Sequence, residues 1–259
     1  MNRITEAFKK GKALITFITG GDPDIGTTEK LIQAMEKAGA DLIEIGIPFS
    51  DPVAEGAVIQ DADERALKAG CTTDKLFEMV SRVRKKTDIP LLFMTYINPV
   101  FTYGKEKFSY RCAECGIDGI IVPDMPFEER DELLEELEAG SIDLISMIAP
   151  TSEERIEMIA AQARGFIYCV SSLGVTGVRE NITTDIGKMI KKIRTVTNTP
   201  CAIGFGISTP EQAGIMASLS DGVIVGSAIV KLIAQYGRNS IGPVSEFVAA
   251  LKKGIEDKR

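Results

Sequence analysis

The chain has 259 residues, 44% hydrophobic and 26% charged, a composition typical of a folded globular protein that excludes wholesale disorder. Its formal net charge of −7 argues against a nucleic-acid binder, which needs a basic face. The lack of histidine excludes a Ser-His-Asp triad, a Cys-His dyad and a histidine-ligated zinc site, so any enzymatic proton transfer must use other side chains.

The five cysteines are odd in number and irregularly spaced, which does not indicate a disulfide framework. Cys112 and Cys115 form one CxxC within a helical stretch, Phe108–Cys115, and we interpret the pair as helix packing rather than a metal or redox site. We expect no metal site. The N-terminal sequence lacks a signal-peptide core, and no apolar run reaches membrane-spanning length, so we expect a cytoplasmic protein.

Short apolar runs recur along the chain, with amphipathic segments between them. Near-continuous hydrophobicity in a short run is typical of a parallel strand that is covered on both faces. The predicted strands are Ala13–Thr19, Asp41–Ile47, Pro90–Tyr96, Gly119–Val122, Asp143–Ile148, Phe166–Val170, Pro200–Phe205 and Gly222–Val225.

The segments between the runs carry helical signals. The stretch from Thr28 to Ala38 places its apolar residues on one face and ends at Gly39, as a helix before a C-cap glycine does. Hydroxyl residues and an early proline are typical of helix starts. Further helices are predicted to begin at Thr73–Asp74, to cover Pro126–Glu138 and Thr151–Ala163, and to begin at Ser208–Glu211.

A weak internal repeat supports this alternation. In AGADLIEIG, CGIDGIIVPD, GSIDLISMIAP and SLSDGVIVGS a helix ends, an aspartate follows and an apolar strand begins. Eight strand–helix units in about 250 residues favour a closed (β/α)8 TIM barrel over the alternative, a doubly wound open sheet. Since no linker interrupts the chain, residues 1–259 are expected to form a single domain, with a short N-terminal helix closing one end of the barrel.

Catalytic residues of such a barrel lie at the C-terminal ends of its strands. Alternation along the second run points Leu42, Glu44 and Gly46 into the barrel and the intervening isoleucines towards the helices. Burial raises the pKa of a carboxyl group, which suits Glu44 to general acid/base work near neutral pH, beside a glycine that leaves room for a ligand. Periodicity alone leaves open a solvated or salt-bridged glutamate.

The loop Pro48–Gln60 follows this strand and carries Asp51 and Glu55 between proline and glycine breakers. A loop of this length over a barrel mouth is either a lid or ligand contact, or a surface loop with solvated acids. The sequence alone does not decide between the two.

Strands seven and eight run into glycine-containing turns, Gly204–Ser208 and Gly226–Ile229. Glycines let backbone amides at a helix start approach a phosphate without lysine or arginine, although each turn alone is also typical of a plain tight connection. The segment Ser171–Arg179 after strand six is rich in glycine and serine, which indicates either a mobile flap or a connection without a role.

With these motifs assembled, the chain resembles the tryptophan synthase alpha subunit family from about Phe8 to the C-terminus. The strings that carry the resemblance are FITGGDP, DLIEIGIPFSDPVAEG, MTYINP, GIIVPDMP, FIYCVSSLGVTG, GFGIS and DGVIVGSAIV. The resemblance implies a lyase that cleaves indole-3-glycerol phosphate to indole and glyceraldehyde 3-phosphate without a cofactor of its own. It also implies a β subunit carrying pyridoxal phosphate, which receives the indole within an α2β2 complex.

The resemblance further implies the site residues. Glu44 matches the family's essential glutamate and is expected to be the general acid/base. Glu55 matches the aspartate that holds the indole N–H, although the motif reads AEG rather than ADG and Ala57 replaces a usual proline. Matched substrate- or phosphate-binding positions are Phe17, Tyr96, Tyr168, Thr176, Gly177, Phe205, Gly206, Gly226 and Ser227.

Two other functions remain open at this point. A phosphoribosyl isomerase would share the paired glycine turns but not the IPFSDP string, and a substrate panel would distinguish it. An alpha-type subunit without turnover would only activate its β partner, and indole release measured with the β subunit would distinguish that alternative.

Overall fold

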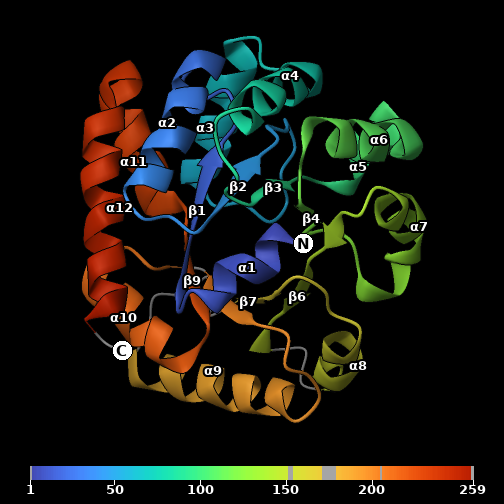
Figure 1. Cartoon of the computed structure of the whole chain (residues 1–259), viewed down its shortest axis with the longest axis vertical. Coiled ribbons are helices and arrows are strands. Elements are labelled where there is room, and N and C mark those ends of the chain that lie inside the picture. The colour runs from blue at the N-terminus through green and yellow to red at the C-terminus, as the bar shows by residue number, and fades with distance from the viewer. Residues whose placement is uncertain (1, 151–153, 171–178, 205, 258–259) are drawn as a thin grey trace.

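The computed structural model describes residues 2–150, 154–170, 179–204 and 206–257, which form one parallel sheet surrounded by helices (Figure 1). Over these residues the sheet has nine strands in the order β5-β4-β3-β2-β1-β9-β8-β7-β6. The strands are β1 (Ala13–Thr19), β2 (Leu42–Gly46), β3 (Leu91–Met94), β4 (Gly119–Ile121), β5 (Asp143–Leu144), β6 (Ser146–Ile148), β7 (Ile167–Val170), β8 (Cys201–Gly204) and β9 (Gly222–Val225).

The strand predicted over Asp143–Ile148 is broken at Ile145, so the prediction of one continuous strand was wrong there. Its halves, β5 and β6, stand at the two ends of the sheet order and pair with β4 and β7 respectively. Because a single residue joins these two ends, the sheet closes on itself. The predicted (β/α)8 TIM barrel is therefore confirmed, with its fifth strand bent to pair in turn with both neighbours.

Helices follow the strands and cover the outer face of the sheet (Figure 1). They are α1 (Arg3–Lys9), α2 (Ile25–Lys37), α3 (Ala57–Lys68), α4 (Thr73–Arg84), α5 (Ile97–Tyr103), α6 (Lys105–Cys115), α7 (Asp131–Ala139), α8 (Ile156–Ala161), α9 (Arg179–Arg194), α10 (Pro210–Leu219), α11 (Ser227–Tyr236) and α12 (Ile241–Glu256), with 3-10 turns η1 (Phe127–Glu129) and η3 (Gly237–Asn239). The predicted starts of α4 and α10 are confirmed, because Thr72 and Thr209 cap the backbone amides there.

Other helix boundaries differ from the prediction. Helix α2 begins at Ile25 rather than Thr28, because the carboxylate of Asp24 caps its first turn. The helix predicted over Pro126–Glu138 begins as the 3-10 turn η1 and becomes α-helical only at Asp131. Within the helix predicted over Thr151–Ala163, α8 covers only Ile156–Ala161, and residues 151–153 lie outside the described residues.

Helix α1 closes the end of the barrel at which the strands begin. In Figure 1 it lies in front of the strands near the middle of the view. Ile4 is fully buried and packs with Ile15 and Leu42 of the barrel interior, while the ring centroids of Phe8 and Phe166 lie 5.6 Å apart. The predicted N-terminal helix that closes one end of the barrel is therefore confirmed.

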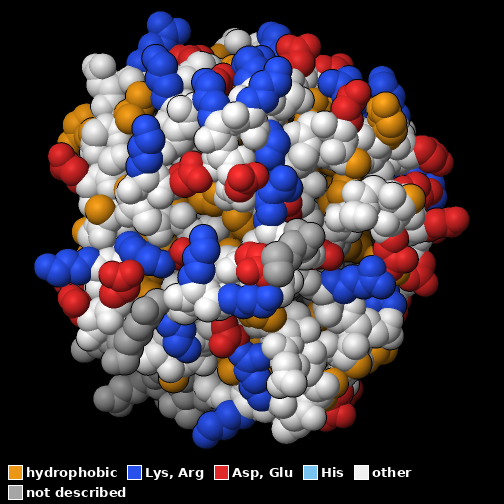
Figure 2. Space-filling view, in the orientation of Figure 1, with side chains coloured by type: hydrophobic (Ala, Val, Ile, Leu, Met, Phe, Trp, Pro, Cys, Tyr) orange, Lys and Arg blue, Asp and Glu red, His pale blue; other side chains and the backbone are white. Residues whose placement is uncertain are grey.

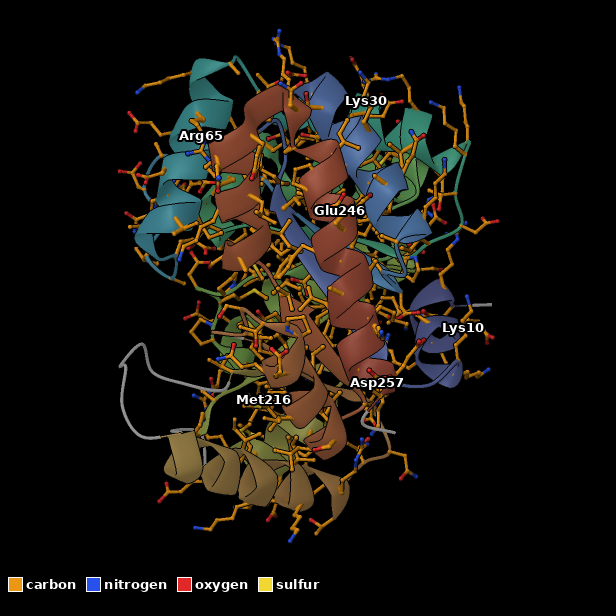
Figure 3. The ribbon with its side chains drawn as sticks, turned by 90° about the vertical axis from the view of Figure 1, so that its left-hand side faces the viewer. Lys10, Lys30, Arg65, Met216, Glu246 and Asp257 are labelled. Carbon is orange, nitrogen blue, oxygen red and sulfur yellow. The ribbon has the colours of Figure 1, made fainter. Side chains whose placement is uncertain are left out.

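Alternate residues of each strand face the interior of the barrel and the surrounding helices. On β2, Leu42 packs inside the barrel, whereas Ile43 and Ile45 join the core between strands and helices. Figure 3 shows part of this outer layer, in which α12 lies beside α2 and reaches α10. Coverage on both faces explains why the strands read as almost continuous hydrophobic runs.

The repeated aspartate joins neighbouring strands at the end of the barrel that α1 closes. The backbone amide of the aspartate donates to the carbonyl oxygen of a residue on the neighbouring strand. The backbone amide of that neighbouring residue donates in return to the aspartate carboxylate, and the N···O distances are 2.8–2.9 Å. The pairs are Asp41 with Leu14, Asp118 with Leu91 and Asp221 with Cys201. The weak sequence repeat therefore marks one recurring strand joint.

Each of these carboxylates also binds a cation from the helix layer. Asp41 accepts from Lys252 at 2.6 Å, and the other two pairs are Asp118 with Arg84 and Asp221 with Arg194. The fourth aspartate of the repeat, Asp143, instead accepts from the side-chain amide of Asn2 at 2.6 Å.

The CxxC lies in the core, as the packing interpretation requires. Cys112 and Cys115 are buried in α6, and burial raises the pKa of both thiols. All five cysteines are free.

On the face shown in Figure 2, Lys and Arg side chains are interspersed with Asp and Glu. Within the described residues, no helix is both long and apolar enough to cross a membrane.

Candidate active site

A cavity of about 600 Å³ opens at the C-terminal ends of the strands, away from α1. Its lining comes from residues of β1, β2, β3, β7 and β9, from the segments that follow β2, β8 and β9, and from α12. The sequence-predicted residues among its lining are Phe17, Glu44, Glu55, Tyr168, Gly206, Gly226 and Ser227. The fold thus brings residues from both ends of the chain into one site.

Glu44 is the most deeply buried acid of this site. Its side chain is 0% exposed, and neither carboxyl oxygen has a hydrogen-bond partner among the described residues. Burial, and secondarily the negative charge of Glu55, raises the pKa of Glu44 to about 8. At neutral pH the carboxyl group therefore mostly holds its proton and can donate it to a molecule in the cavity.

Glu55 reaches the cavity from the loop between β2 and α3. Burial raises the pKa of this half-buried carboxyl, and a hydrogen bond from Tyr96 opposes the rise. The Tyr96 hydroxyl also accepts the backbone amide of Ala54 at 2.9 Å, and its ring centroid lies 5.5 Å from that of Phe49. Tyr96 is therefore placed against the loop that carries Glu55, and it is not among the cavity-lining residues.

Two strand glycines make room for the aromatic rings of the site. A Cβ atom on Gly46 would stand 2.8 Å from the Phe17 ring, and one on Gly204 would stand 2.6 Å from the Tyr168 ring. The room at Gly46 was predicted for a ligand, but that prediction was wrong because the Phe17 ring fills it. Burial, and then the charges of the two glutamates, raises the pKa of Tyr168, so its hydroxyl stays protonated.

The far side of the cavity is built from a glycine turn and a helix start. Gly206 has φ +79°, which favours glycine, and open space stands where a side chain would lie. Helix α11 begins at Ser227 after Gly226, a glycine that has no side chain to cap the helix. The backbone amides at the positive end of a helix attract anions, and Ser208 and Lys231 also line this cavity.

The loop after β2 is shorter than predicted. Ala57–Gln60 form the first turn of α3, so the irregular segment ends at Gly56. Asp51 is exposed and accepts a hydrogen bond from the hydroxyl of Ser50, which places it outside the cavity lining.

The remaining predicted residues, Thr176, Gly177 and Phe205, lie outside the described residues. The predicted flap Ser171–Arg179 lies outside them as well, except for Arg179, at which α9 begins.

The sequence analysis did not predict several residues that line the cavity, although the periodicity of the sequence could have indicated some of them. Met94 follows Leu92 on the inward face of β3, and Lys231 lies one helical turn after Ser227, so strand and helix periodicity could have indicated both. Phe247 comes from α12 and reaches the cavity only through tertiary packing. No local pattern in the sequence indicates that contact.

Among the residues that the structure describes, no group of acidic or cysteine side chains could hold a metal ion. A closed parallel barrel with two carboxyl groups in a cavity at the C-terminal ends of its strands is the architecture of a (β/α)8-barrel enzyme. Within that class the chain belongs to the tryptophan synthase alpha chain family, whose model matches residues 5–257.

Full-length relatives agree with this assignment. The chain is 50% identical over 260 residues to a tryptophan synthase alpha chain of Thermoanaerobacter sp. (strain X514), covering 98% of this chain and 99% of the relative. It is 46% identical over 259 residues to that of Lacticaseibacillus casei, covering 100% of this chain and 97% of the relative.

Solved structures agree as well. Tryptophan synthase subunit alpha from Legionella pneumophila str. Paris superposes with a TM-score of 0.91 at 34% identity, covering 99% of each chain. A chain of the tryptophan synthase α2β2 complex from the hyperthermophile Pyrococcus furiosus superposes with a TM-score of 0.85 at 35% identity, covering 93% of this chain and 98% of that chain.

Proposed function

We propose that the chain cleaves indole-3-glycerol phosphate to indole and glyceraldehyde 3-phosphate, with Glu44 as the group that moves the proton. The observation that carries this proposal is the placement of Glu44, whose buried carboxyl has a pKa of about 8 and lines the same cavity as Gly206 and the start of α11. Family membership supports the same reaction.

Glu44 can supply both proton transfers that the retro-aldol step needs. Its protonated carboxyl donates to the ring carbon that bears the side chain, which leaves a cationic ring and a carboxylate. The carboxylate then takes the proton of the side-chain hydroxyl as the carbon–carbon bond breaks, and the bonding electrons return to the ring. The products are indole and an aldehyde, and Glu44 ends in its starting state.

Glu55 supports the charge that develops on the ring. Its carboxylate accepts the indole N–H, and the donor from Tyr96 holds that carboxylate in place. The amides at the start of α11, together with Gly206 and Ser227, bind the phosphate group and fix the distance from Glu44 to the bond that breaks. Phe17 and Tyr168 enclose the substrate between these two ends, and Thr176, Gly177 and Phe205 are proposed to complete the site.

The partner belongs to the same proposal. A solved neighbour is part of a tryptophan synthase α2β2 complex, and we propose that this chain likewise binds a β subunit, which carries the pyridoxal phosphate and receives the indole. A cytoplasmic location and a single domain over residues 1–259 are further parts of this proposal. The alternative of a subunit without turnover is not favoured, because both glutamates point into one cavity.

The test replaces the proton donor by its isostere. Glu44→Gln keeps the shape of the side chain but cannot donate or accept the proton, so we expect kcat with the β subunit present to fall about 10²–10⁴-fold while KM changes little. Indole release is measured for this variant and for Glu256→Gln, which alters an exposed glutamate of α12. Near-normal turnover in Glu44→Gln would show that another group moves the proton.

A further inference from the structure

The segment that follows β4 carries an aspartate that reaches across to the end of the neighbouring strand. Asp124 lies in a tight turn, in which the amide of Met125 donates to the carbonyl oxygen of Val122 at 3.2 Å. An oxygen of the Asp124 side chain accepts the backbone amide of Ile97 at 3.0 Å. Ile97 follows β3, which pairs with β4, so this bond joins the ends of two paired strands. The proposed reaction gives Asp124 no role.

This bond continues the pairing of β3 with β4 beyond the strands themselves. Just after β3, the amide of Thr95 donates to the carbonyl oxygen of Ile121 at 3.0 Å, and two residues later the amide of Ile97 donates to Asp124. Ile97 is the first residue of α5, where a helix amide has no partner within the helix, and the preceding Tyr96 makes no side-chain capping bond. Asp124 therefore fixes the backbone at the point where the chain turns from β3 into α5.

Tyr96, the residue at this turn, contacts the loop after β2. Its buried ring has its centroid 5.5 Å from that of Phe49, and its hydroxyl accepts the amide of Ala54 at 2.9 Å. Ala54 immediately precedes Glu55 in the chain. Because a closely packed ring transmits a shift of its backbone, the position of Tyr96 determines where this part of the loop lies.

A second contact holds Glu55 from its other side. The side-chain amide of Gln60 donates to the carbonyl oxygen of Glu55 at 2.8 Å, from the first turn of α3. This contact is local, so it holds the shape of the loop rather than its place in the barrel. The contact through Tyr96 instead connects the loop to the ends of β3 and β4, in the same sheet as Glu44 of β2.

We propose that Asp124 is a positioning residue for the reaction, which holds Glu55 at its place beside the indole nitrogen by fixing Tyr96. Without the acceptor at Asp124 the start of α5 loosens, Tyr96 shifts, and the backbone before Glu55 moves with it. A displacement of about 1 Å in a positioned group can cost roughly 10²-fold in rate. This inference rests on the proposed function, since it assumes that Glu55 holds the indole N–H.

The first experiment measures kcat and KM for indole release by Asp124→Ala and Asp124→Asn, each with the β subunit added. Asp124→Ala removes the acceptor, so we expect kcat to fall about tenfold or more and KM to change less than about threefold, because the phosphate group is bound away from this loop. Asp124→Asn keeps an oxygen that can accept the Ile97 amide and should restore kcat to within about threefold of the unaltered chain. The matched control is Asp24→Ala, which removes the carboxyl cap of α2, a residue outside the cavity lining, and should leave kcat unchanged.

A double-mutant cycle tests the route through Tyr96. Tyr96→Phe lacks the hydroxyl that accepts the amide of Ala54, so adding Asp124→Ala to it should lower kcat by less than about twofold. Equal losses with and without the Tyr96 hydroxyl would overturn the proposal. Normal kcat in Asp124→Ala, equally slow Asp124→Asn, or a loss of the same size in Asp24→Ala would overturn it as well.

The third measurement needs no turnover. The backbone amide signal of Ala54 in the full chain is followed by NMR, and Tyr96→Phe, which removes its acceptor, defines the direction in which the signal moves. Asp124→Ala should move the signal in the same direction, and Asp24→Ala should leave it in place. An unmoved signal in Asp124→Ala would overturn the proposal, whereas unchanged turnover in Glu55→Gln would refute the assumed role of Glu55, on which the NMR result does not depend.

Discussion

Glu44 has both carboxyl oxygens buried without a hydrogen-bond partner among the described residues, so its charged form is costly to the folded chain. The unfolded chain loses this proton near pH 4.5, whereas the folded chain keeps it until about pH 8. The stability that the group contributes is therefore full below pH 4.5 and is lost as the pH rises to about 8. Catalysis and stability make opposite demands on this one side chain.

Glu44→Gln should therefore become more stable relative to the unaltered chain as the pH rises from 5 to 8. The difference in free energy of unfolding should grow by up to about 1.4 kcal/mol for each pH unit, since glutamine has no proton to lose. Urea unfolding of both chains at pH 5 and pH 8 measures it, with Glu256→Gln as the exposed control. A difference that stays constant with pH would contradict the raised pKa of Glu44.

The sequence revealed some of these residues and concealed others. The inward direction of Glu44 follows from the period of two along β2, and its burial confirms that direction. Asp63 lies in the string QDADERALK, where alternating charges are typical of a solvated helix face, and only the packing of α3 on β1 and α11 shows that it is buried. A local sequence pattern predicts the direction in which a side chain points, but its burial depends on which other elements pack against that face.

At the scale of elements, the start of α3 determines where the loop with Glu55 ends. Gly56 has φ −77° and ψ 163°, an extended conformation, and Ala57 is the exposed first residue of the helix. Proline is favoured at such a position, because the first helical amide has no partner within the helix and the preceding residue is already extended.

Ala57→Pro is therefore expected to raise the free energy of unfolding by about 0.5–1 kcal/mol and to leave kcat/KM within about twofold. Gln60→Pro is the matched control in the same helix, because its amide donates to Gly56 at 3.1 Å and would be lost. Chemical denaturation of the three chains measures the effect. A destabilised Ala57→Pro with normal Gln60→Pro would mean that α3 begins elsewhere.

Element positions could be predicted well from the sequence, and their ends less well. Hydroxyl caps such as Thr209 are local, so the start of α10 could be read directly. The break of the fifth strand at Ile145 could not be predicted, because it arises from pairing with two different neighbours, β4 and β7, far apart in the chain. Ring closure is a property of the sheet and not of any one strand.

At the scale of the whole molecule, the two ends of the barrel do different work. The end closed by α1 holds the reciprocal aspartate joints, and the opposite end holds the cavity. Among these joints, the carboxylate of Asp118 binds Arg84 and Arg3, each at 2.9 Å, and the amide of Leu91 at 2.9 Å. Because the residues that stabilise the barrel and the residues proposed for catalysis lie at opposite ends, a substitution at one end can alter stability without altering catalysis, and the reverse.

Asp118→Ala should lower the free energy of unfolding by about 3 kcal/mol, because it leaves a partly buried Arg84 and the Leu91 amide without their acceptor. The kcat measured below the unfolding transition should stay unchanged. Asp88→Ala, which removes an exposed carboxylate 3.8 Å from Arg3, is the control and should leave the unfolding midpoint in place. A fall in kcat for Asp118→Ala would mean that the two ends are coupled.

The bent fifth strand has a consequence for how the ring of strands opens. A second cavity, of about 390 Å³, lies behind Ile145 between the barrel wall and the segments of α7 and α8, so the joint between β5 and β6 is backed by unfilled space. Transient opening of the sheet should therefore begin at the joint between β5 and β6. This joint lies away from Glu44, so the residues around Glu44 should stay in place while the sheet is open.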